Sequence, residues 1–227
     1  MKIGILQAGS FVQEMHDITG DVDNMFKVML AGQDFTFDVW RVFEDQFPDS
    51  VAVCDGWLIT GSKFGVYEDH AWIPPLEDFI RDAVTQSRPI VGVCFGHQLI
   101  AQALGGKVEK FKGGWNVGRQ IYDFGGVELP LNAWHQDQVV ELPQGAHVLA
   151  SNGTCDYAAI VYGDRAFTVQ GHPEFGPDAI EGLVDFVGPG KVPQEQLDAV
   201  MDALADPTAN EVIADQIADF LRRPRNA

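Results

Sequence analysis

The chain has 227 residues, of which 46% are hydrophobic and 21% charged, a composition typical of a soluble globular protein with one substantial core. Its formal net charge of -18 argues against nucleic-acid backbones and anionic membranes as partners. The first residues lead directly into a strand-like run without the layout of a signal peptide, and no stretch is long and apolar enough to span a bilayer. We therefore expect a cytoplasmic protein that binds neither nucleic acid nor membranes.

Strand and helix signals alternate in the first part of the chain. The expected elements are, in order, a strand over 2–7, a helix over 21–32, strands over 35–43 and 56–61, a helix over 75–87, a strand over 89–93 and a helix over 95–104. This alternation predicts an α/β fold, in which a mostly parallel sheet is covered by helices on both faces.

Beyond Gly106 the pattern changes to short β-like runs separated by turn residues. The runs cover 107–124, 138–142, 147–151, 157–162 and 166–170, and helices are expected over 177–186, 193–204 and 208–222. We interpret the β runs as a smaller antiparallel or mixed extension of the sheet. No composition shift divides the chain, so 1–190 is expected to form one domain and 191–227 a helical extension of it. The last helices are expected to pack on this domain, with a homodimer or partner contact as the alternative.

A cysteine lies between two glycines in the sequence Gly-Val-Cys-Phe-Gly-His-Gln, where a strand changes into a helix. A residue at such a junction occupies a sharp turn, and the small neighbours Gly92 and Gly96 let the backbone fold tightly. The side chain of Cys94 would project from the carboxyl edge of the sheet beside a helix start, which favours the nucleophilic thiolate. Cys94 is therefore the candidate nucleophile.

A thiol nucleophile needs an acid–base partner and a group that orients this partner. The sequence Gln-Gly-His-Pro-Glu-Phe offers both, because alternate residues of an extended segment project to the same side. His172 and Glu174 can therefore converge, with Pro173 restricting the backbone between them. A carboxylate beside an imidazole fixes its tautomer and stabilises the imidazolium. We predict a Cys94–His172–Glu174 triad, against the alternative of a surface turn.

Gly61 ends the third expected strand and opens the loop that follows it. Such a glycine can aim a backbone N–H at developing negative charge, although an ordinary turn would look the same in sequence. Its position one strand–helix unit before the nucleophile strand would bring this loop next to Cys94 at the sheet edge.

Other residues with reactive side chains are given structural roles. His97, on the first turn after the nucleophile, is expected to be structural, and Cys54 and Cys155 are expected to be buried thiols. No cluster has metal-ligand spacing, so no metal is expected. No glycine motif for phosphates is present, so no nucleotide cofactor is expected.

The two motifs together resemble those of the class I (triad) glutamine amidotransferases, over about residues 1–186. The variants in this chain are most similar to standalone members related to the amidotransferase domain of GMP synthetase, a group that includes cytosolic γ-glutamyl peptidases. The resemblance implies the family's α/β fold for a catalytic domain over 1–190. It also implies a cysteine hydrolase that acts through a Cys-His-Glu triad.

The resemblance assigns further roles around the nucleophile. It implies oxyanion donors at the backbone of Gly61 and of Phe95, the residue after the cysteine. It matches Gln98 to the residue that lines the glutamine pocket. The segment matched to the loop that holds the α-amino and α-carboxylate groups of the substrate runs from Trp134 through His135 and Gln136 to Asp137. The alternative for this segment is a solvent-exposed edge loop.

Three functions remain open. The first is cleavage of the γ-glutamyl amide bond of glutamine through a γ-glutamyl thioester, releasing ammonia and glutamate. Nothing in the sequence resembles a synthetase domain, so an acceptor of this ammonia would lie on a separate synthetase subunit. The second is a free-standing γ-glutamyl peptidase for glutathione-like compounds. The third is a catalytically silent binding or regulatory protein on the same fold, against which the complete triad argues. No cofactor is expected.

Overall fold

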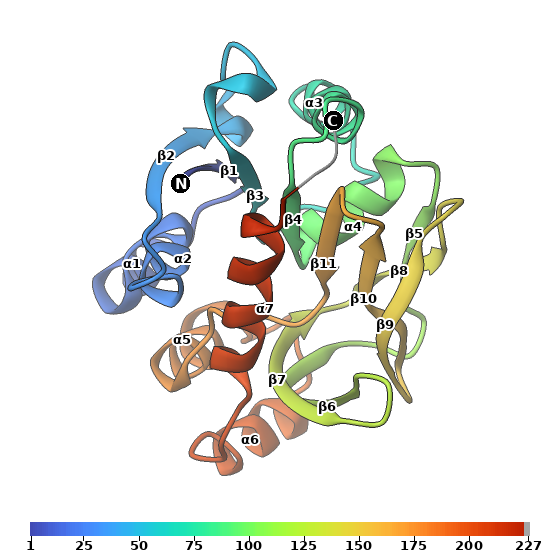
Figure 1. Cartoon of the computed structure of the whole chain (residues 1–227). Helices are drawn as coiled ribbons and strands as arrows, with labels where there is room; N and C mark the ends of the chain where they lie inside the picture. Colours follow the sequence, from blue (N-terminus) through green and yellow to red (C-terminus); the bar gives the residue numbers. More distant parts are fainter. Residues whose placement is uncertain (225–227) are drawn as a thin grey trace.

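A sheet of nine strands forms the centre of the molecule, in the order β2-β1-β3-β4-β11-β10-β9-β6-β7, in a computed structural model that describes residues 1–224 (Figure 1). All the strands, in chain order, are β1 (Lys2–Gln7), β2 (Thr36–Arg41), β3 (Gly56–Ile59), β4 (Ile90–Val93), β5 (Lys107–Lys110), β6 (Asn116–Asp123), β7 (Glu128–His135), β8 (Asp137–Glu141), β9 (His147–Asn152), β10 (Cys155–Tyr162) and β11 (Ala166–Val169). Strands β5 and β8 lie outside the nine-stranded sheet and pair with each other in a separate antiparallel sheet of two strands. The strands from β2 to β11 in this order pair in parallel and the rest antiparallel. The predicted α/β fold with an antiparallel extension is therefore confirmed.

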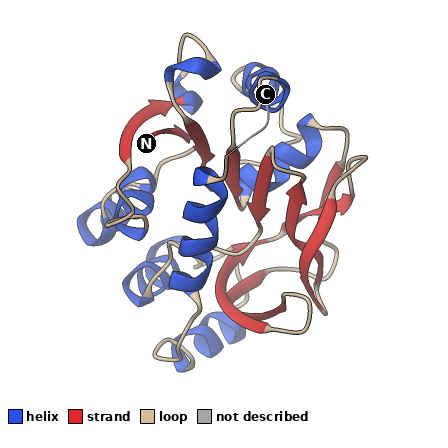
Figure 2. Ribbon diagram, in the orientation of Figure 1, coloured by secondary structure: helices blue, strands red, loops and turns tan. Residues whose placement is uncertain are grey.

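Helices cover both faces of this sheet, and α7 crosses in front of the central strands in Figure 2. They are α1 (Gln13–Thr19), α2 (Val22–Met29), α3 (Ile73–Thr85), α4 (Phe95–Ala103), α5 (Pro177–Gly182), α6 (Gln194–Asp202) and α7 (Asn210–Arg222). A π-helical turn over Leu183–Val187 continues α5. Within residues 1–224, no helix combines the length and the apolar character that crossing a membrane requires.

The central strands are apolar along their whole length because both faces of the sheet are buried. Successive side chains point to opposite faces, so neighbouring residues of β3 enter different core clusters. Ile59 packs in the cluster that contains Leu99 of α4, whereas Leu58 packs in the cluster that contains Ile217 of α7. The C-terminal helix thus belongs to the main core of the domain.

Two β regions differ from the expectation. The run over 107–124 is divided into β5 and β6, because the intervening glycines allow a turn and Gly114 adopts a φ of +97°. Strand β7 was not expected at all, since it contains Pro130, which has no N–H for a sheet ladder. It lies at the edge of the nine-stranded sheet, where a proline is tolerated.

Helix α1 was also not expected. It has only seven residues, and Val12 at its N-cap makes no side-chain hydrogen bond to the first turn. Without a capping side chain the local sequence carries little helix signal. Its buried residue, Met15, instead packs in a third cluster with side chains such as Ile180 of α5. Tertiary contacts therefore account for this helix.

The parallel part of the sheet collects the candidate residues at one edge. β1, β3, β4 and β11 point the same way, so the loops that follow them meet beyond their carboxyl ends. These loops contain Ser10 after β1, Gly61 after β3, Cys94 after β4 and His172 after β11. Segments that are far apart in sequence are thus brought to one place.

Gly4 of β1 offers a test of this packing, because a Cβ at this position would overlap the buried ring of Trp57 on the neighbouring strand β3. We expect Gly4→Ala to lower the free energy of unfolding by about 2 kcal/mol, since the core must shift to accept the methyl group. Equilibrium unfolding in urea would measure the change.

The matched control is Gly153→Ala, at an exposed turn where nothing lies within 4 Å of an added Cβ. Its effect is expected to stay below about 0.5 kcal/mol. Equal effects of the two substitutions would contradict the close packing of β1 against Trp57.

Candidate active site

Cys94 lies on the sharp turn between β4 and α4, as the sequence predicted. Its backbone has φ 51° and ψ -101°, a conformation that residues other than glycine rarely adopt. The turn is held at both ends, since the Cys94 N–H donates to the carbonyl of Val169 at 2.9 Å and its own carbonyl accepts from the N–H of Gln98 at 3.0 Å. The residue is only 5% exposed. The thiol is therefore presented by a buried and firmly positioned backbone.

The two flanking glycines are required by close backbone contacts. A Cβ on Gly92 would lie 2.8 Å from the nitrogen of His97 on the first turn of α4. A Cβ on Gly96 would lie 2.9 Å from the Cβ of Ile59 on β3. Both positions have room only for hydrogen, so the Gly-x-Cys-x-Gly pattern reflects the tight packing of α4 against β4 and β3.

His172 and Glu174 lie on the segment after β11 and converge as predicted. The Nδ1 atom of His172 is 2.7 Å from Oε1 of Glu174, and both side chains are almost fully buried. The His172 N–H donates to the carbonyl of Asn132 on β7 at 2.7 Å, and the ring of Phe175 stacks on the imidazole at 4.0 Å. The imidazole is therefore held by Glu174 and Phe175, and the backbone that carries it is held by Asn132.

Burial disfavours the charged form of His172, but the negative charges of Glu174 and of the Cys94 thiolate outweigh it and raise the pKa of His172 to about 10. The sulfur of Cys94 lies within hydrogen-bonding reach of the same ring. Since Nδ1 of His172 contacts Glu174, Nε2 is the ring nitrogen that remains to contact the sulfur of Cys94. This arrangement favours the imidazolium form of His172.

Gly61 lies directly against these two side chains. A Cβ at this position would be 3.0 Å from Cε1 of His172 and 3.8 Å from Cβ of Cys94. Phe95 is the first residue of α4, so its backbone N–H has no acceptor within the helix. The two backbone segments predicted to donate to an oxyanion thus flank the nucleophile.

A cavity of about 150 Å³ opens over Cys94 and His172. Its further lining residues come from loops at the carboxyl edge, from the start of α2, from β7 and from the segment that follows α5, namely Gly9, Ser10, Phe11, Val12, Val22, Gly61, Ser62, Lys63, Trp134, Glu174, Phe175, Leu183, Phe186, Val187 and Lys191. The loop after β1 could have been found by the rule that ligands bind at this sheet edge. No sequence signal places Lys191 at the cavity. It lies between α5 and α6, and only the packing of these helices in the folded chain brings it there.

Of the residues matched to substrate binding, Trp134 lines this cavity, whereas Gln98, His135, Gln136 and Asp137 do not. The Nε2 of Gln98 donates to the carbonyl of Asp137 at 2.7 Å and to Oε1 of Gln170 at 3.0 Å. The carboxylate of Asp137 accepts a hydrogen bond from the Tyr67 hydroxyl at 3.0 Å, and burial raises its pKa. Gln136 is half-buried and reaches the carbonyl of Phe111. In this structure these side chains bond to backbone carbonyls and to the side chains of Gln170 and Tyr67.

Two histidines near the site are buried and neutral. His135 is 4% exposed, and burial together with the charge of His172 lowers its pKa to about 3. Its neighbour Trp134 lines the cavity instead. His97 is fully buried with Nδ1 at 2.8 Å from the Thr168 hydroxyl, and burial lowers its pKa to about 3. The geometry of His97 fits the structural role expected for it.

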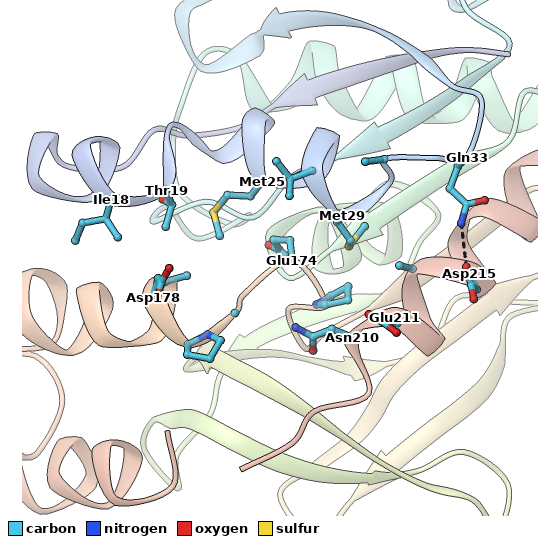
Figure 3. Close-up of a pocket in the computed structure, with 17 residues that line it drawn as sticks. Ile18, Thr19, Met25, Met29, Gln33, Glu174, Asp178, Asn210, Glu211 and Asp215 are labelled. Carbon is cyan, nitrogen blue, oxygen red and sulfur yellow. Dashed lines mark hydrogen bonds between the residues drawn. The ribbon is translucent and has the colours of Figure 1, made fainter. Parts of the chain in front are cut away.

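A second and larger cavity of about 660 Å³ lies on the other side of Glu174, between α2, α5 and α7 (Figure 3). Cys94 does not line it, whereas Glu174 lines both cavities. All its charged lining residues are acidic, namely Glu174, Asp178, Glu211 and Asp215. Size alone therefore does not identify the candidate active-site cavity. The smaller cavity is the candidate because it contains the thiol of Cys94 and the imidazole of His172.

The raised pKa of His172 predicts the effect of removing the neighbouring carboxylate. We expect Glu174→Gln to lower the pKa of His172, because burial then acts with less opposing negative charge. A pH titration of the imidazole signals by NMR would measure this change, with Glu181→Gln on the exposed face of α5 as the control.

The same pKa predicts how stability depends on pH. A folded pKa above the unfolded value of 6.5 stabilises the fold fully below pH 6.5, and this contribution is lost as the pH rises to about 10. Glu174→Gln should flatten this decline. An unchanged NMR titration and an unchanged decline would contradict the electrostatic role of Glu174.

Comparisons of the sequence and of the fold with known proteins identify the family of this chain. The family model of the class I glutamine amidotransferases matches residues 27–183. Gamma-glutamyl peptidase 3 of Arabidopsis thaliana is 32% identical over 74% of this chain and 74% of its own length. A glutamine amidotransferase-like protein of Schizosaccharomyces pombe is 28% identical over 96% of this chain and 98% of its own.

A crystal structure of a glutamine amidotransferase from Methylobacillus flagellatus has the same fold, with a TM-score of 0.75 over 97% of this chain and 91% of that one, at 23% identity. The family match covers the strand–turn–helix unit of Cys94 together with His172 and Glu174. This chain belongs to the class I glutamine amidotransferase family.

Proposed function

We propose that the protein hydrolyses γ-glutamyl amide bonds through a thioester on Cys94. The observation that carries this proposal is the cavity in which the cysteine, at its strained turn, meets the His172–Glu174 pair. The names of its relatives, a γ-glutamyl peptidase and a glutamine amidotransferase-like protein, support a γ-glutamyl carbonyl as the electrophile.

The first half-reaction forms the acyl enzyme. The Cys94 thiolate attacks the γ-carbonyl carbon, and the electron pair of the C=O bond moves onto oxygen. The backbone N–H groups of Gly61 and Phe95 would receive this oxyanion, each contributing on the order of 3 kcal/mol to the stability of the transition state. Collapse of the intermediate breaks the C–N bond, and His172 gives its proton to the leaving nitrogen.

The second half-reaction regenerates the thiolate. Neutral His172 takes a proton from a water molecule, which attacks the thioester carbon. The C–S bond breaks, glutamate leaves, and His172 keeps the proton as imidazolium. Glu174 holds the ring in one tautomer throughout, through its contact of 2.7 Å with Nδ1. A single imidazole thus serves as acid and then as base.

Glutamine and γ-glutamyl peptides pass through the same steps and differ only in the group that leaves. With glutamine this group is ammonia, which a separate synthetase subunit would have to accept if it is to be used. With a γ-glutamyl peptide the leaving group is the amino group of the next residue, and no partner is needed. The chemistry of Cys94, His172 and Glu174 is common to both.

Replacing the nucleophile tests the proposal and also the alternative of a silent protein. We expect Cys94→Ala to reduce the hydrolysis of glutamine and of γ-glutamyl peptides by at least about 10⁴-fold, because no other group can form the thioester. Release of glutamate by the purified protein would be measured. Mass spectrometry of the wild-type protein mixed rapidly with substrate should show the γ-glutamyl adduct on Cys94.

The matched controls are Cys54→Ala and Cys155→Ala. Burial raises the pKa of Cys54 to about 11 and that of Cys155 to about 12, so both thiols are inert at neutral pH. Neither variant should change the rate by more than its effect on stability explains. Full activity of Cys94→Ala, or a wild-type protein that hydrolyses none of these compounds, would refute the proposed function.

A further inference from the structure

Two lysines line the cavity that contains Cys94, in a chain whose acidic residues far outnumber its basic ones. Lys63 lies on the loop after β3, and Lys191 lies between the π-helical turn and α6. The chain has 15 lysines and arginines against 33 aspartates and glutamates. Basic groups are thus the minority charge in this chain, and two of them lie at the cavity over Cys94.

Neither of these ammonium groups has a carboxylate partner among residues 1–224. The Nζ of Lys63 instead lies 5.3 Å from the centre of the Phe64 ring, and both lysines are exposed. Lys27 and Lys107, by contrast, form ion pairs with Asp23 and Glu109. The rim of the Cys94 cavity therefore carries two ammonium groups without an ion-pair partner in the described part of the chain, while the carboxylate that lines the same cavity, Glu174, contacts His172.

The same rim is also apolar. Val12 and Phe186 line the cavity and are 45% and 46% exposed, which is high for side chains of this kind. Phe11 and Val187 also line this cavity. A ligand that reaches this rim can therefore bury an aliphatic group while it presents a carboxylate to the lysines.

The position of the lysines indicates which half of the substrate they meet. The γ-carbonyl has to lie at Cys94, which is buried at the bottom of the cavity. In the proposed geometry, the group beyond the scissile bond extends from there towards the exposed rim. Ammonia is too small to reach it, whereas an amino acid joined through its α-nitrogen carries a carboxylate and a side chain in that direction.

We propose that Lys63 and Lys191 select γ-glutamyl peptides whose leaving residue has a free carboxylate and an apolar side chain, over glutamine. This inference rests on the proposed function, and it assigns the leaving group that the triad chemistry leaves open. The products are glutamate and the free amino acid or peptide, with water as the only co-reactant. The acidic lining of the second cavity would repel the same carboxylate.

The test compares substrates that differ in one charge. The kcat/KM values of the purified protein are measured on γ-glutamyl-leucine, on γ-glutamyl-leucinamide and on glutamine. The wild-type protein should prefer the free acid over the amide and over glutamine. In the Lys63→Met, Lys191→Met double variant, kcat/KM for the acid should fall about 10-fold, and that for the amide by less than about twofold.

Two further measurements sharpen the comparison. The variant Lys63→Glu should reverse the preference between acid and amide, and added salt should weaken it, because the lysines are exposed and screened. The matched control is Lys112→Met, which removes an exposed lysine outside the cavity and should leave all three values unchanged.

The outcomes separate the two proposals. Equal losses on the acid and the amide would mean that the lysines hold the glutamyl half, and no loss on either would mean that they hold nothing; both results overturn this inference and leave the proposed function intact. A wild-type protein that hydrolyses none of the three substrates would instead overturn the proposed function itself.

Discussion

The backbone conformation of Cys94 is the constraint on which the rest of the site depends. A positive φ of 51° in a residue with a side chain costs on the order of 1–3 kcal/mol, so the surrounding structure must hold it. It is held by close packing at Gly92 and Gly96, where α4 lies directly on β4 and β3, and by hydrogen bonds on both sides of the turn. This backbone conformation directs the Cys94 side chain away from the core and into the cavity. The side chain then lies beside the N–H groups at the start of α4, which have no acceptor within the helix.

Besides the backbone at Cys94, the site depends on the charges around His172. His172 is buried, so its charge would be lost without the carboxylate of Glu174 on one side and the thiolate on the other. The nearby His135 is buried as well, lacks such partners, and stays neutral. Two imidazoles in one buried region thus differ in charge because of their neighbours alone. On a larger scale, two lysines line the cavity over Cys94 in a chain with 15 lysines and arginines against 33 aspartates and glutamates.

Local sequence was a good guide to the fold where the elements are regular. The strand over 2–7 and the parallel order of the sheet follow from continuous apolar runs that alternate with amphipathic helices. It was a poor guide where tertiary contacts replace local signals. Strand β7 contains Pro130 and exists because it lies at a sheet edge, and α1 has no capping residue and exists because Met15 is buried against α5. Neither fact can be read from a window of neighbouring residues.

The sequence by itself was enough to predict the candidate triad, because the turn at Cys94 and the pairing of His172 with Glu174 are local features, although the fold brings the two segments together. Gly-x-Cys-x-Gly specifies a tight turn at a strand end, and His-x-Glu in an extended segment places an imidazole and a carboxylate on the same side. Only the tertiary structure decided what surrounds them. Trp134 faces the cavity and His135 faces away from it, because alternate residues of β7 point in opposite directions and the pairing with β6 sets which is which. Lys63 and Lys191 are 128 positions apart by their numbers, and the folded chain alone brings both to the rim over Cys94.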